Sequence, residues 1–165
     1  MNKINIVKSS VWLAALFFSN QLLADNKEIV LQEVKKLDFN TVFARVGNCH
    51  FDVEKQDLVH SDSSVCTYSI VEKGQLKLIA EPLTTVEIEF KSNLSVEGKV
   101  IFNPEALAIS ELGRYSILTN KPVAVKVGAS GVVDIDLGGT LKVISQLGPD
   151  LKLSASYGVE YQYIK

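Results

Sequence analysis

The segment that most constrains the fold spans residues 130–143, where apolar and polar side chains alternate on both sides of a glycine pair. Val133, Ile135 and Leu137 alternate with Asp134 and Asp136. Successive side chains of an extended chain point to opposite faces, so this order places the apolar groups on one face and both carboxylates on the other. The segment therefore predicts a strand that is buried on one face only.

Two glycines, Gly138 and Gly139, follow this strand, and the alternation resumes at Thr140 and Leu141. Glycine adopts positive φ without steric penalty, as tight turns and glycine bulges require. The motif therefore predicts a hairpin or a glycine bulge at the corner of a sandwich.

Alternation of the same kind recurs along the chain, with turn residues about every ten positions and no convincing long helix. The predicted strands cover residues 37–43, 49–53, 66–70, 76–78, 86–90, 100–102, 115–117, 123–127, 151–157 and 159–163, with residues 106–109 as either a strand or a helical turn, and residues 55–64 as a loop. Many short strands with regular turns are typical of an all-β protein, an antiparallel sandwich or barrel of roughly eight to ten strands. We expect one domain over residues 37–165, because the chain of 165 residues has the composition of an ordinary globular protein.

The amino terminus has the pattern of a secretory signal peptide. Lys3 and Lys8 precede the apolar run 11–18, and Ala24 offers a small residue for cleavage. The run is shorter than the roughly 20 residues that cross a bilayer as a helix, so we predict a signal peptide over residues 1–24, no membrane span after cleavage, and export of the rest.

Charge and cysteine content narrow the possible partners. Cleavage would remove two of the 17 basic residues and none of the 19 acidic ones, and no Lys or Arg cluster remains to bind phosphates, so we expect no nucleic acid partner. The only cysteines, Cys49 and Cys66, form an even set in an exported chain, which indicates a disulfide. Metal ligation and a reactive thiol are the alternatives.

Residues 25–36 match the pattern of a helix and the pattern of a strand only in part. Val30, Leu31, Val34 and Leu37 fall at helical spacing, whereas Ile29 and Leu31 share one face of a strand until Glu33 breaks the pattern. A free, weakly amphipathic amino-terminal arm fits both patterns.

The sequence offers little catalytic chemistry. His50 and His60 are the only histidines, and a Ser-His-Asp set built on His60 would need a preorganised geometry that a polar loop does not supply. Asp134 and Asp136 could form an acid-base or calcium-binding pair, but an outward solvated pair or the protection of an edge strand is the simpler interpretation. We therefore expect no enzyme, no metal and no cofactor.

Three tyrosines near the end of the chain, Tyr157, Tyr161 and Tyr163, could form a platform on which sugar rings stack. They occupy odd positions of extended segments and so share one face. This shared face favours packing in the core, with one hydroxyl reaching water.

Three features together resemble a known family: the triplet Leu37-Asp38-Phe39, the Gly138-Gly139-Thr140-Leu141 motif, and a last strand rich in tyrosine. They are similar to a family of bacterial exported domains of unknown function, which is distantly similar to spore coat protein U and to archaic chaperone-usher pilins. The resemblance implies an immunoglobulin-like β-sandwich in the periplasm or on the surface of a bacterium.

The resemblance also implies a mode of action. Pilins of this kind are incomplete sandwiches that receive a strand from the amino-terminal arm of the next subunit. Ile29, Leu31 and Val34 would be the donor residues here. The resulting hypothesis is a fimbrial or adhesion subunit whose partners are copies of itself or other fimbrial subunits, with a periplasmic chaperone. The alternative is a self-contained module that binds a glycan or a protein, through loops such as residues 55–64.

Overall fold

The computed structural model describes residues 28–39, 42–43, 45–59, 65–66, 71–94, 98–146 and 156–164. The predicted signal peptide and the first part of the predicted strand 151–157 lie outside these ranges, as do His60 and most of the predicted strand 66–70.

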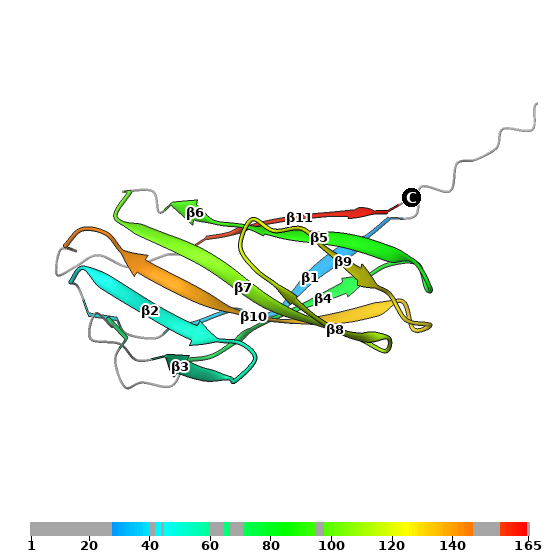
Figure 1. The fold of residues 1–165 in the computed structure, drawn as a ribbon, viewed down its shortest axis with the longest axis horizontal. Helices are drawn as coiled ribbons and strands as arrows, with labels where there is room; N and C mark the ends of the chain where they lie inside the picture. Colours follow the sequence, from blue (N-terminus) through cyan, green and yellow to red (C-terminus); the bar gives the residue numbers. More distant parts are fainter. Residues whose placement is uncertain are drawn as a thin grey trace, which may run out of the picture.

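Eleven strands form two antiparallel sheets in the described part of the chain (Figure 1). The large sheet contains β1 (Val30–Lys35), β2 (Gly47–Asp52), β3 (Asp57–Val59), β4 (Gly74–Ile79), β6 (Asn93–Leu94), β7 (Val100–Ser110), β8 (Gly113–Ile117) and β10 (Val132–Val143). The small sheet contains β5 (Thr85–Lys91), β9 (Val123–Lys126) and β11 (Gly158–Tyr163). No described residue is helical, and the prediction of an all-β, antiparallel sandwich is confirmed.

Two long strands, β7 and β10, run through the whole large sheet (Figure 1). They pair from Asp134 opposite Ile109 to Val143 opposite Val100 without a shift of register. On its other edge β10 pairs with β4 over its first half and with β2 over its second half. Each half of the sheet is therefore completed by different short strands.

The glycine pair does not form a turn or a bulge, so the sequence prediction was wrong at this point. β10 continues straight through Gly138 and Gly139, where its edge partner changes from β4 to β2. A Cβ on Gly138 would lie 2.7 Å from the carbonyl oxygen of Phe51, and one on Gly139, whose φ is 126°, would collide with the carbonyl oxygen of Asn103. The glycines are needed because neighbouring strands approach closely, not because the chain reverses.

Pro104 does not end a strand either. The expected short strand at 100–102 and the ambiguous residues 106–109 belong to one strand, β7. The carbonyl oxygen of Pro104 accepts a hydrogen bond from Thr119 Oγ1 at 2.5 Å, on the edge away from β10, between the positions where β6 and β8 pair with β7. Since the nitrogen faces the same way as the carbonyl, the missing N–H removes no bond to β10.

The main core lies between the two sheets. Alternate residues of β5, namely Val86, Ile88 and Phe90, are fully buried there. The cluster contains Leu76, Leu78, Ala80, Val86, Ile88, Phe90, Ala106, Ala108, Ile117, Val125, Val127, Val133, Ile135 and Leu137. Burying a large aliphatic or aromatic side chain contributes about 1.5–3 kcal/mol, so this cluster is the chief source of stability.

A second cluster surrounds the disulfide. Cys49 and Cys66 are bonded, as predicted, and neither is free. They pack with Val65, Val100, Phe102, Leu141 and Val143. Leu37, Phe39 and Val42 pack against this cluster. The strand expected at 37–43 is not formed in its described part, where only Asp38 and Val42 make isolated bridges. Phe39 stacks edge-on against Phe102. The expected loop 55–64 begins with a turn and the short strand β3, and residues 60–64 lie outside the described ranges.

The two terminal strands reach the same end of the sandwich (Figure 1). Val30, which begins β1, lies opposite Ile79, and the N–H of Ile164, which follows β11, donates to the carbonyl of Thr85 at 3.0 Å. Ile79 and Thr85 flank a single turn between β4 and β5. The first and last strands are thus neighbours of consecutive strands, one in each sheet.

Candidate functional site

Each terminal strand forms an edge of its sheet. Among the described residues, β1 pairs only with β4, and β11 pairs only with β5. An edge strand leaves a row of backbone N–H and C=O groups without a partner strand, which makes it a template for another chain. These edges are the surfaces that the hypothesis of strand-mediated assembly requires.

β1 resolves the ambiguity of the amino-terminal arm in favour of a strand. Leu31 lies opposite Leu78, and both Ile29 and Leu31 pack against the main core. Val34 does not join them, because its side chain is 60% exposed. Two of the three predicted donor residues therefore share a buried face, and in this structure they fill an edge of their own sheet.

A β-bulge at Val34 interrupts the alternation of apolar and polar side chains along β1. Glu33 pairs with Leu76 and Lys35 pairs with Gln75, so Val34 is an extra residue. The carboxylate of Glu33 remains close enough to Tyr157 to contribute to the raised pKa of that phenol, although burial of the ring is the larger cause. After the bulge Lys35 forms an ion pair of 3.3 Å with Glu72.

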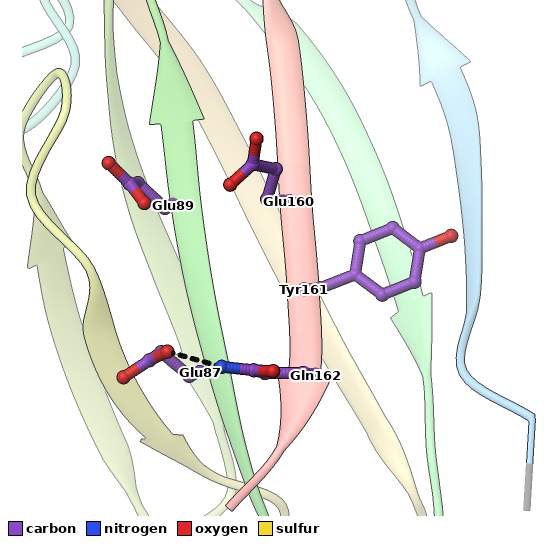
Figure 2. Close-up of a pocket in the computed structure, with 5 residues that line it drawn as sticks. All are labelled: Glu87, Glu89, Glu160, Tyr161 and Gln162. Atoms are coloured by element: carbon purple, nitrogen blue, oxygen red, sulfur yellow. Dashed lines mark hydrogen bonds between the residues drawn. The ribbon is translucent and has the colours of Figure 1, made fainter.

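β11 is regular where β1 is bulged. It pairs with β5 from Gly158 opposite Lys91 to Tyr163 opposite Val86 without a shift of register. The prediction that the tyrosines pack in the core is confirmed for Tyr157 and Tyr163, which lie against the main cluster, and the Tyr163 hydroxyl accepts a hydrogen bond from the Glu81 N–H at 2.9 Å. Tyr161 lies on the same face but is 38% exposed, and Figure 2 shows its ring pointing away from β5.

The outer face of the small sheet carries acidic side chains, which form hydrogen bonds and ion pairs with neighbouring side chains of the same face. Figure 2 shows Glu87, Glu89, Glu160 and Gln162 around a shallow depression beside Tyr161. Gln162 donates to Glu87 at 2.8 Å. Lys91 lies 2.6 Å from Glu89 and 3.4 Å from Glu160, and the hydrogen bond to Glu89 is the main reason that its pKa is raised. These contacts fix the side chains on one face of β11 and leave its edge open.

Of the two histidines considered for a catalytic set, the described residues include only His50. His50 lies in β2, within the predicted strand 49–53, with Nδ1 2.8 Å from Thr140 Oγ1 and 4.0 Å from Glu105. Thr140 thus belongs to the predicted glycine motif but serves as a partner of His50, while Leu141 is buried in the second cluster.

The aspartates of β10 lie on the outer face of the large sheet, as expected, and each has a cationic partner. Asp136 is 2.7 Å from Lys73 Nζ, and Asp134 is 3.8 Å from Lys77 Nζ. No group of three or more candidate metal ligands occurs among the described residues. In the same ranges we find no helix with the length and apolarity needed to cross a membrane.

Comparison with known proteins finds no match: no family model, no curated protein and no solved structure matches this chain. The fold defines a two-sheet, disulfide-bonded antiparallel sandwich. The similarity to spore coat protein U and to pilins stays a prediction from the sequence.

Proposed function

We propose that the protein is an exported structural subunit, of a fimbrial or adhesive kind, whose amino-terminal strand β1 is exchanged between copies. The observation that carries the proposal is the position of β1. It directly follows the predicted signal peptide, forms an edge of the large sheet, and is held by one ladder and by the partly buried Ile29 and Leu31.

Exchange of β1 would preserve the contacts that it makes. A β1 strand from a second copy can pair with β4 in the same register and place Leu31 opposite Leu78, so the intramolecular and intermolecular forms contain the same ladder. The bulge at Val34 and the inward Glu33 are also common to both forms, and they favour neither. The balance depends on the connecting residues 36–46 and on protein concentration.

Release of β1 is the step that the structure makes easy. Most of its residues are exposed, and terminal segments with few buried contacts open locally at a small fraction of the global stability. In this proposal a periplasmic chaperone would protect the β4 edge before assembly, and other fimbrial subunits could supply the strand.

Strand complementation tests the proposal. A chain that lacks residues 25–36 should bind a synthetic peptide of residues 25–36 and regain thermal stability, because the peptide restores the ladder to β4. A peptide with Leu31→Glu should bind at least tenfold more weakly, since the substitution would bury a carboxylate opposite Leu78. Fluorescence anisotropy and thermal melts would measure both effects.

The full chain is the matched control, because its own β1 occupies the site and should slow peptide uptake. A shortened chain that is folded and monomeric and ignores the peptide would contradict strand exchange. That result would favour the alternative hypothesis, a self-contained module that binds a glycan or a protein.

A further inference from the structure

We infer that the edge of β11 that no described strand occupies pairs with β11 of a second copy, in an antiparallel dimer whose two-fold axis passes beside Tyr161. The two small sheets would then form one continuous sheet. This inference goes beyond the exchange of β1, because it uses the other terminal strand and the other sheet.

The first argument is that β11 lacks the devices that normally protect an edge. β1 has a bulge at Val34 and the inward charge of Glu33, and the edge strand β9 is short and ends in Lys126. The other short edges are β3, β6 and β8, which contain three, two and five residues, and β8 carries the charge of Arg114. β11 has six residues in unbroken register and no Lys or Pro, and its one charge, Glu160, is already held by Lys91.

The second argument is the direction of the backbone groups. Ile164 and Thr85 are directly opposite in the register of β11 and β5, and the N–H of Ile164 donates to the carbonyl of Thr85. Hydrogen-bonded pairs alternate along an antiparallel ladder, so the N–H and C=O groups of Val159, Tyr161 and Tyr163 point away from β5. A second strand can therefore bond to these three residues without breaking the existing ladder.

The third argument is that one register is self-complementary. Residues that face the core must lie opposite residues that face the core, so odd positions must pair with odd positions. An axis beside Tyr161 places Val159 opposite Tyr163 of the second copy, and Glu160 opposite its Gln162. An axis beside Glu160 would bring two carboxylates together, and an axis beside Gln162 would place Glu160 opposite Ile164.

Tyr161 would lie at the centre of this interface. Its ring is on the inner face of β11 but remains 38% exposed, and in Figure 2 it extends past the edge of the small sheet. Pairing across the axis would bring the two Tyr161 rings together and cover them, which is a favourable contact between aromatic side chains.

Disulfide trapping in the full chain, purified after export, tests the register. With the axis beside Tyr161, the two copies of residue 161 form a hydrogen-bonded pair with Cα atoms about 5.5 Å apart, within reach of a disulfide. The two copies of residue 160 would be about 8 Å apart, beyond that reach. We therefore expect Tyr161→Cys to form covalent dimers at least tenfold faster than Glu160→Cys, with the Cys49–Cys66 bond intact in both.

A second variant tests the edge without a new thiol. Tyr161→Pro removes an N–H that faces away from β5, so the melting temperature should stay within a few degrees of that of the wild type while sedimentation equilibrium shows only monomers. Equal cross-linking of the two cysteine variants, or a wild-type chain that is monomeric up to its solubility limit, would overturn the inference. These experiments leave residues 25–36 unchanged, so a dimer held by exchange of β1 would survive Tyr161→Pro and would be recognised as such.

Discussion

Gly138 and Gly139 show how tightly single residues control the packing of the large sheet. At this point three strands meet: β10 carries the glycines, β2 presents the carbonyl of Phe51, and β7 presents the carbonyl of Asn103. No side chain fits between these backbones. The sequence identified the positions correctly but suggested a turn, because glycine has the same residue signature in a turn and in a close strand approach.

Substitution of Gly139 should therefore be far more damaging than substitution of a glycine with free space. Gly139→Ala should lower the free energy of unfolding by about 2–4 kcal/mol or prevent folding, because both the positive φ and the collision with Asn103 oppose a Cβ. Urea denaturation would measure the change. Gly158→Ala is the matched control: a Cβ there would meet Lys91 at an ordinary 3.4 Å, and we expect a change below about 1 kcal/mol. Equal losses in both variants would contradict this account.

Glu105 is a carboxylate whose environment disfavours its charge. Its pKa is raised, mainly by burial and also by Asp52, while His50 opposes the shift. An acid with a raised pKa in the folded state binds its proton more tightly there than in the unfolded chain. It therefore destabilises the fold at pH values above its folded pKa, and this penalty disappears as the pH falls through that value.

Glu105→Gln should consequently raise the melting temperature at pH 7, and the gain over the wild type should shrink toward about pH 4, near the ordinary pKa of a glutamate. Differential scanning calorimetry at several pH values would measure it. Glu160→Gln, at a carboxylate that is 69% exposed, is the control and should show a smaller gain. A gain from Glu105→Gln that is independent of pH would indicate a packing effect instead of relief of buried charge.

At the scale of elements, the sequence predicted strands well where one face is buried along the whole strand. β5 is the clearest case, because its buried Val86, Ile88 and Phe90 alternate strictly with polar residues. Prediction from the sequence failed where contacts between distant parts of the chain decide the pairing of the strands. Residues 37–43 have strand composition, but their described part pairs only at isolated bridges. The proline that divides the pattern of β7 is harmless because the edge beside it lies between β6 and β8.

The edges of the sheets could not be predicted from the pattern either. Alternation tells which face of a strand is buried, but it does not tell which strands lie at an edge, because that depends on long-range pairing. In the sequence, the only sign of the bulge in β1 was that the charged Glu33 interrupts the apolar alternation. The sequence contains one weak indication of the open edge of β11, the absence of Lys and Pro from residues 158–163. This absence can be interpreted only when the pairing of β11 with β5 is known.

At the scale of the whole molecule, the large sheet extends beyond the small one, and its two halves are covered differently. The half with β4 and β8 packs against β5 and β9 in the main core. Phe39, Val65 and the disulfide cover the sheet in the half with β2. The second half is built on a smaller cluster, so it depends more on its covalent bond.

Removal of the disulfide should therefore weaken the molecule unevenly. The double variant Cys49→Ala, Cys66→Ala should lose about 3 kcal/mol of stability, as expected for a cross-link that closes a loop of about this length, here 17 residues. Hydrogen exchange should accelerate most in β2 and in residues 139–143, while β5 stays protected. Uniform acceleration across both halves would show that the sandwich opens as one unit.

The shared location of the outer ends of β1 and β11 has a mechanical consequence. β1 and β11 both have their outer ends beside the turn between β4 and β5. A pulling force applied between the start of β1 and the end of β11 would load the outermost hydrogen bonds of each ladder one after another, as in opening a zipper, and would not shear whole strands at once. The molecule would yield at low force along its two margins, while the long pair β7 and β10 carried none of the load until both margins had opened.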